Sequence, residues 1–181
     1  MAPAADPVRL VELRQQELPN LVELWGKRLE VPADSRIDGR KLLHALARQE
    51  STSGRDGGHA RVEKAYQPGG GLHRRHVVEL FAAYGDAAVA SWSSWQIMYP
   101  TAWELGMRGQ PWDLWDDGEA GKWVVRFIER RAFRKGARTV REVADAYNSG
   151  THRDAFQPKR YMDRVERFYM EALLGPPGVQ A

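Results

Sequence analysis

The chain has 181 residues, of which 43% are hydrophobic and seven are Trp, so its length predicts one domain and its composition excludes a wholly disordered chain. The absence of cysteine excludes disulfides and thiolate metal sites, and no stretch of about 20 apolar residues is available to span a membrane. The formal net charge of +3 suits an anionic partner, whether nucleic acid, phospholipid or cell-wall polymer, without choosing among them.

The first third of the chain carries apolar residues at helical spacing. This pattern covers residues 8–30, and Pro19 is predicted to break it into two helices because proline lacks the backbone donor that a helix interior needs. Asp38 is suited to cap the next helix, which continues to Glu50. The Gly-rich stretch that follows predicts loops, with a weak alternation over 61–66 that is typical of a short strand.

Five more helices are predicted in the rest of the chain. Thr139 and Glu142 have the spacing of a capping box, and Pro100 and Gly106 bracket a short helix. The predicted helices cover residues 76–84, 100–105, 120–128, 140–149 and 160–174. With the three helices before them, they predict a mainly α chain of about eight helices and one small β-prone lobe.

Glu50 is the residue best suited to acid–base chemistry. It lies seven residues after Leu43 and four after Leu46, so it continues the apolar face of its helix. A carboxyl in that position is partly desolvated, which raises its pKa and lets it keep a proton for donation to a leaving oxygen. The alternative is an ordinary exposed Glu in a last helical turn.

Four blocks of sequence resemble those of lytic transglycosylases and goose-type lysozymes, in the same order over residues 38–170. Gln49-Glu50-Ser51 is similar to the Glu-Ser motif that ends an apolar helix in those families. Residues 91–106, which read SWSSWQIMYPTAWELG, look like a block that usually reads Gly-Leu-Met-Gln-Ile-Met-Pro-x-Thr-Ala-x-x-Leu-Gly. Residues 146–150 (AYNSG) and 161–165 (YMDRV) resemble Ala-Tyr-Asn-Ala-Gly and Tyr-Val-x-x-Val. Each block alone is weak, but their common order and spacing make chance agreement improbable.

This chain departs from the family pattern in the second block. Ser93-Ser94-Trp95 replaces the usual Gly-Leu-Met before Gln96, and the proline is displaced by one position. The stretch between Glu50 and Gln96 is also long, which indicates an enlarged β-lobe. These differences concern the shape of the sugar subsites more than the chemistry.

The resemblance implies a lysozyme-like α+β fold and cleavage of the β-1,4 bond between N-acetylmuramic acid and N-acetylglucosamine in peptidoglycan glycan strands, without a cofactor or metal. The catalytic domain would cover 36–175, between an N-terminal tail and helical extension over 1–35 and a C-terminal tail over 176–181. Glu50 would be the general acid and then the base. The residues implied to hold its surroundings or bind the glycan are Ser51, Gln96, Met98, Tyr147 and Asn148.

Two further aromatic residues are candidates for the site. Trp95 beside Gln96 is suited to stack on a sugar ring, and Tyr161 is suited to contact the site. Packing in the core is the alternative for Trp95, Tyr161 and Tyr147, and a helix C-cap is the alternative for Asn148.

The need for a second catalytic carboxylate distinguishes a hydrolase from a transglycosylase. An inverting hydrolase needs one to activate water, whereas a transglycosylase needs none because the sugar's own 6-hydroxyl attacks. Glu63 is either that base or the partner of a nearby cation such as Arg61 or Lys64, and the ion pair is favoured. We therefore expect a lytic transglycosylase, with a hydrolytic muramidase and a catalytically idle wall-binding or virion module as the alternatives.

Cations gather between positions 126 and 138, where the chain has Arg126, Arg130, Arg131, Arg134, Lys135 and Arg138. Such a face is usually solvated, or it holds the chain against an anionic wall polymer, and by itself it does not support nucleic-acid binding. His73 and His76 have no third ligand at metal-site spacing. The first residues lack the pattern of a secretory signal, so we expect the protein to reach the wall as a phage-encoded endolysin or a virion-associated enzyme. We also expect a monomer.

Overall fold

The computed structural model describes residues 7–51, 60–71, 75–149 and 159–174. This part of the chain is mainly helical, as predicted, but has seven α-helices instead of about eight, with a small sheet. The helices are α1 (Pro7–Arg28), α2 (Gly39–Ser51), α3 (Arg75–Tyr84), α4 (Tyr99–Glu104), α5 (Asp117–Phe127), α6 (Val140–Ser149) and α7 (Lys159–Leu174). Within these residues, no helix is both long and apolar enough to cross a membrane.

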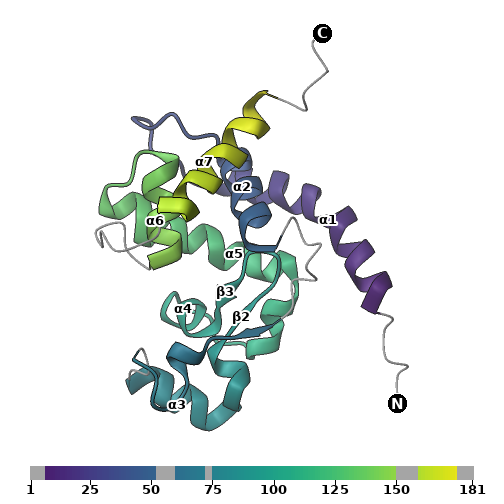
Figure 1. Ribbon diagram of the computed structural model, residues 1–181, viewed down its shortest axis with the longest axis vertical. Coiled ribbons are helices and arrows are strands. Elements are labelled where there is room, and N and C mark those ends of the chain that lie inside the picture. Colours follow the sequence, from purple (N-terminus) through teal and green to yellow (C-terminus); the bar gives the residue numbers. More distant parts are fainter. Residues whose placement is uncertain (1–6, 52–59, 72–74, 150–158, 175–181) are drawn as a thin grey trace.

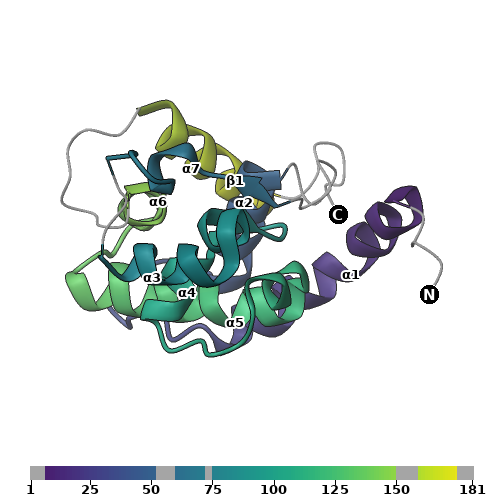
Figure 2. The same cartoon turned by 90° about the horizontal axis from the view of Figure 1, so that it is seen from below.

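Helix α1 explains the lower count, because Pro19 lies inside one continuous helix and does not divide it. Leu18, Val22 and Leu29, on α1 and just after it, are buried in the hydrophobic core, and α1 packs on α2 and α5. Burying each such side chain stabilises the fold by roughly 1.5–3 kcal/mol, which together outweighs the roughly 3 kcal/mol cost of an interior proline. Figures 1 and 2 both show the N-terminal half of α1 extending away from the other helices.

Two glycines allow the helices to approach α1 closely. A Cβ atom at Gly26 of α1 would lie 2.5 Å from the Cα of Arg40 in α2. A Cβ atom at Gly121 of α5 would lie 2.4 Å from the Trp25 ring of α1. Both distances are far below van der Waals contact, so these helices pack at their observed separation only because neither position has a side chain.

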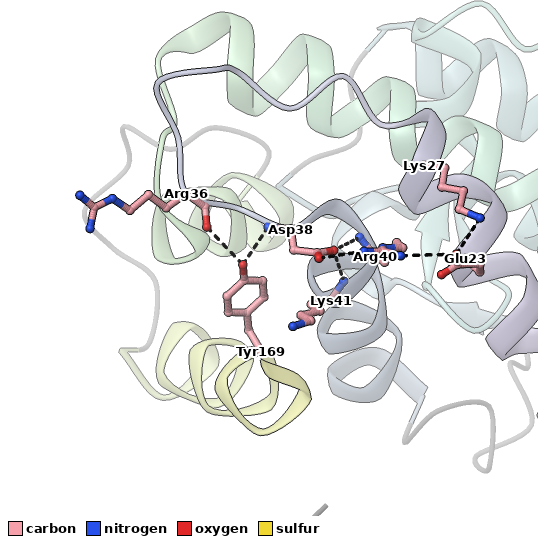
Figure 3. Close-up of polar contacts among 7 residues, drawn as sticks. All are labelled: Glu23, Lys27, Arg36, Asp38, Arg40, Lys41 and Tyr169. Carbon is pink, nitrogen blue, oxygen red and sulfur yellow. Dashed lines mark hydrogen bonds and ion pairs between the residues drawn. The ribbon is translucent and has the colours of Figure 1, made fainter. Parts of the chain in front are cut away.

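The start of α2 is fixed to both α1 and α7 (Figure 3). Asp38 caps the helix as predicted, since its Oδ1 accepts the backbone N–H of Arg40 at 2.9 Å. The Tyr169 hydroxyl of α7 accepts the backbone N–H of Asp38 at 2.8 Å and faces the carbonyl of Arg36. The Arg40 guanidinium contacts Glu23 of α1 at 3.5 Å. These contacts fix the helix that presents Glu50 at its other end.

Three short antiparallel strands form the sheet, in the order β1 (Arg61–Val62), β2 (Ala90–Trp92) and β3 (Ile97–Met98). The pairing places Ser91 opposite both Arg61 and Met98. Because paired residues in neighbouring strands point to the same face of a sheet, these three side chains form one row. Figure 1 shows the sheet between α2 on one side and α3 and α4 on the other. The three side chains of the row line the same hollow as Glu50 at the end of α2.

Candidate active site

Helix α2 presents Glu50 in its last turn. Leu43 and Leu46 on the same face are fully buried, and Glu50 lies half-buried where this face reaches the surface. Ser51 is 2% exposed and its hydroxyl donates to the carbonyl of Ala47 at 3.0 Å, which fixes the end of the helix. Ser51 therefore holds the surroundings of Glu50, and its expected contact with the glycan is wrong because its side chain does not reach the surface.

Tyr161 of α7 donates a hydrogen bond from its hydroxyl to Oε1 of Glu50. Burial is the largest influence on the pKa of Glu50 and raises it above its ordinary value; the Glu63 charge acts in the same direction. The Tyr161 hydrogen bond and the Arg61 and Arg164 charges lower this pKa, but less than burial raises it. Burial also raises the pKa of Tyr161 well above its ordinary value, so Tyr161 keeps the proton that it donates.

A cleft of about 380 Å³ opens beside Glu50. Its walls come from α2, all three strands, α4, α5 and α6, which are distant in sequence. The structure brings together in this cleft four residues predicted to line it, namely Gln96, Met98, Tyr147 and Asn148. A larger hollow of about 850 Å³, beside α1 and the start of α5, contains none of the predicted site residues. The chemistry predicted from the sequence therefore points to the smaller cleft.

The turn between β2 and β3 forms one wall of the cleft and is strained. Ser93 and Gln96 have φ values of 68° and 50°, a left-handed conformation that costs a non-glycine residue on the order of 1–3 kcal/mol. Ser93 stands where the family block has Gly, which adopts this conformation without strain. The backbone N and the hydroxyl of Ser94 each donate to buried Asp117 at 2.7 Å. These bonds fix the turn and leave Gln96 facing the cleft.

Trp95 does not stack on a sugar, and that prediction is wrong. Its side chain is 0% exposed and lies in the hydrophobic core, with the indole N–H directed at the carbonyl of Leu43 at 3.4 Å. Its own carbonyl accepts the Tyr147 hydroxyl at 2.7 Å. Trp95 therefore connects the turn to α2 and α6 through hydrogen bonds, which fixes the positions of its neighbour Gln96 and of Tyr147.

Helix α6 supplies Tyr147 and Asn148. It begins with the predicted capping box, in which the Thr139 N–H donates to Glu142 at 2.9 Å and the Glu142 N–H donates to Thr139 at 3.2 Å. The Tyr147 ring packs edge-on against Phe127 with centroids 5.4 Å apart, so it is both a packing residue and a wall of the cleft. Burial and the Glu50 charge raise the pKa of Tyr147 well above its ordinary value. Asn148 is exposed at the cleft.

Glu63 lies in the same cleft and is also ion-paired. Its Oε1 lies 2.7 Å from Nε of Arg61 and 3.1 Å from the Ser91 hydroxyl. Ser91 is in turn 2.9 Å from Oε1 of Gln96, so its single hydroxyl proton is shared among neighbouring acceptors. The predicted ion pair with Arg61 is confirmed. Ser91, which no sequence pattern singled out, lies opposite Arg61 in the strand pairing, and its hydroxyl links Glu63 to Gln96.

Among the residues described, no group of three or more His, Asp or Glu side chains could hold a metal ion. His73 and the side chain of His76 lie outside them. No protein-family model matches the chain, and comparison with curated proteins and with solved structures found no match either. The family resemblance therefore rests on the sequence blocks alone, and the site has to be judged by its own geometry.

Proposed function

We propose that this chain cleaves the β-1,4 bond between N-acetylmuramic acid and N-acetylglucosamine in peptidoglycan, with Glu50 as general acid and base. The observation that carries the proposal is the place of Glu50. It is a half-buried carboxyl of raised pKa, held by Tyr161, at a cleft that Gln96, Tyr147 and Asn148 also line. A carboxyl that keeps its proton can protonate a leaving glycosidic oxygen.

The proposed reaction is non-hydrolytic. Glu50 protonates the glycosidic oxygen, the bond from that oxygen to muramyl C1 breaks, and C1 becomes oxocarbenium-like. The Glu50 carboxylate then takes the proton of the muramyl 6-hydroxyl as that oxygen bonds to C1. Glu50 returns to its protonated form, no water is consumed, and the product has a 1,6-anhydromuramyl end. One carboxyl serves both steps, which suits a cleft where the second, Glu63, is ion-paired.

The neighbours of Glu50 would orient the reacting groups. Tyr161 engages Oε1, so Oε2 is the oxygen left to exchange a proton with the glycan. Gln96 and Asn148 would donate to or accept from sugar hydroxyl and acetamido groups, and Met98 would contact the apolar face of a ring. Tyr147 borders the same space and would limit how the muramyl ring sits.

A hydrolytic muramidase is the second candidate, and one observation favours it. Glu63 lines the same cleft as Glu50 and is near enough for its charge to raise the pKa of Glu50. An inverting hydrolase uses a second carboxylate, set across from the acid, to activate water. In that mechanism Glu63 would be the base and the product would have a hydrated, reducing muramyl end.

A catalytically idle wall-binding or virion module has less support, because binding alone requires no carboxyl of raised pKa in the cleft. By analogy with the families that the sequence blocks resemble, we propose that the wall is reached as a phage-encoded endolysin or virion-associated enzyme. The test is digestion of purified peptidoglycan, followed by turbidity and by mass analysis of the soluble fragments. Anhydro ends lack the one water that hydrolysis adds, and an inactive protein would release no fragments at all.

A further inference from the structure

The proposed reaction makes no use of a row of cations on the helical segment that continues α5. That segment passes through a π-helical turn (Ile128–Ala132) and a 3-10 turn (Phe133–Lys135). Four exposed cations, here called the basic row, run from the last turn of α5 along this segment: Arg126, Arg130, Arg134 and Lys135. The three arginines follow one another at intervals of four residues, so they lie near one another along the segment.

The basic row has no carboxylate partner within the described part of the chain. Cations beside it on the same segment are paired: Arg131 lies 2.7 Å from Glu104 and Arg138 lies 2.7 Å from Asp34. Arg126 contacts the Trp123 ring and a backbone carbonyl, both of which are neutral. Among the described residues, the positive charge of the row is therefore not neutralised by a direct ion pair.

Helix stability does not account for the whole row. Cations in the last turn of a helix interact favourably with its dipole, which explains Arg134 and Lys135. Arg126 lies in the last turn of α5, but the helical backbone continues through Ile128, so the end of the whole segment lies more than one turn beyond Arg126. Like charges four residues apart also destabilise a helix. Glu129 is a carboxylate within the same segment, but it accepts a backbone N–H of Glu30 at 3.1 Å and forms no ion pair with a cation of the basic row.

We propose that the basic row binds a wall-attached polyanion whose phosphodiester groups repeat along the chain. The choice of a wall polymer rests on the proposed function, because α5 also supplies Phe127 to the cleft, so the row and the cleft share one helical element. Nucleic acid fits less well. Single strands are bound through exposed aromatic rings, and the exposed Trp112 and Trp115 lie before α5 and not in the row.

The test measures retention on purified cell walls in a Glu50→Gln background, so that the wall stays intact and the readout does not depend on cleavage. Walls that carry phosphodiester polymers are compared with the same walls after chemical removal of those polymers. The variant Arg130→Gln/Arg134→Gln is compared with Arg36→Gln/Lys159→Gln. The second pair makes the same change in net charge at two exposed cations outside the row.

Removing the polymer, or the two row arginines, should lower the apparent affinity by about tenfold at low ionic strength and flatten its salt dependence. The control variant should stay within about twofold of the parent. Equal retention on stripped walls, equal losses in both variants, or tighter binding to duplex DNA or anionic vesicles than to walls would each overturn the proposal. Polymer-dependent retention in the Glu50→Gln background, together with a wild-type protein that releases no fragments from the same walls, would instead reject the enzymatic proposal and leave the basic row in place.

Discussion

Replacing Tyr161 by Phe tests whether the Tyr161 hydroxyl sets the acidity of Glu50. The side chain is 6% exposed, and the substitution removes only the donor to Glu50 Oε1. A hydrogen bond to a charged acceptor is worth about 1.5–3 kcal/mol, against about 0.5–1.5 kcal/mol for a neutral one, so the bond favours the carboxylate by about 1–1.5 kcal/mol. Its loss should raise the pKa of Glu50 further and extend the protonated, active form to higher pH.

The assay is the pH dependence of kcat/KM for release of soluble fragments. At a fixed pH on the alkaline limb, the variant should keep about tenfold more of its own maximal rate than the wild type does, because 1.4 kcal/mol corresponds to tenfold. Tyr169→Phe is the matched control. It removes another buried α7 hydroxyl, which accepts the Asp38 N–H at 2.8 Å, and should cost about 1–3 kcal/mol of stability without moving the pH profile. A Tyr161→Phe profile that overlays the wild-type profile, or moves to lower pH, would refute this account.

Three other substitutions test the remaining assignments. Glu50→Gln should keep the fold and lose about 10²–10⁴-fold in lytic rate, because the amide cannot donate a comparable proton. The pKa of Glu50 is raised on folding, so wild-type stability should fall as the pH rises from the ordinary Glu range through the raised pKa. In thermal melts, the Tm of Glu50→Gln relative to that of the wild type should therefore increase with pH. Trp95→Phe should lower the free energy of unfolding by about 1–3 kcal/mol in denaturant titrations, with KM little changed; a higher KM at unchanged stability would return Trp95 to the glycan. Glu63→Gln should cost much less activity than Glu50→Gln, and an equal loss would favour the hydrolytic mechanism.

Local signals in the sequence located much of the fold. The Asp38 cap and the Thr139–Glu142 box depend on side chains within a few residues, and both are present as predicted. Pro19 was misread because the packing of α1 on α2 and α5 overrides a local preference. Periodicity within one segment carries no information about such contacts, which join residues far apart along the chain.

The candidate site was predicted only in part for the same reason. The apolar face of its helix indicated a partly buried Glu50, but its hydrogen bond to Tyr161 joins residues 111 positions apart. The place of Trp95 beside Gln96 made it a candidate for stacking on a sugar, with core packing as the alternative. The left-handed backbone at Ser93 and Gln96 turns Gln96 toward the cleft, and Trp95 lies in the core. A backbone conformation that is unusual for these residue types cannot be read from their identities.

The most direct test of the central claim is mass analysis of the soluble fragments that wild-type protein and Glu50→Gln release from the same purified peptidoglycan. We expect muropeptides with 1,6-anhydromuramyl ends from the wild type and a release lower by about 10²–10⁴-fold from Glu50→Gln. Fragments with only hydrated, reducing muramyl ends would contradict the transglycosylase mechanism and transfer the base role to Glu63. Undiminished release by a folded Glu50→Gln protein would contradict the assignment of Glu50 altogether.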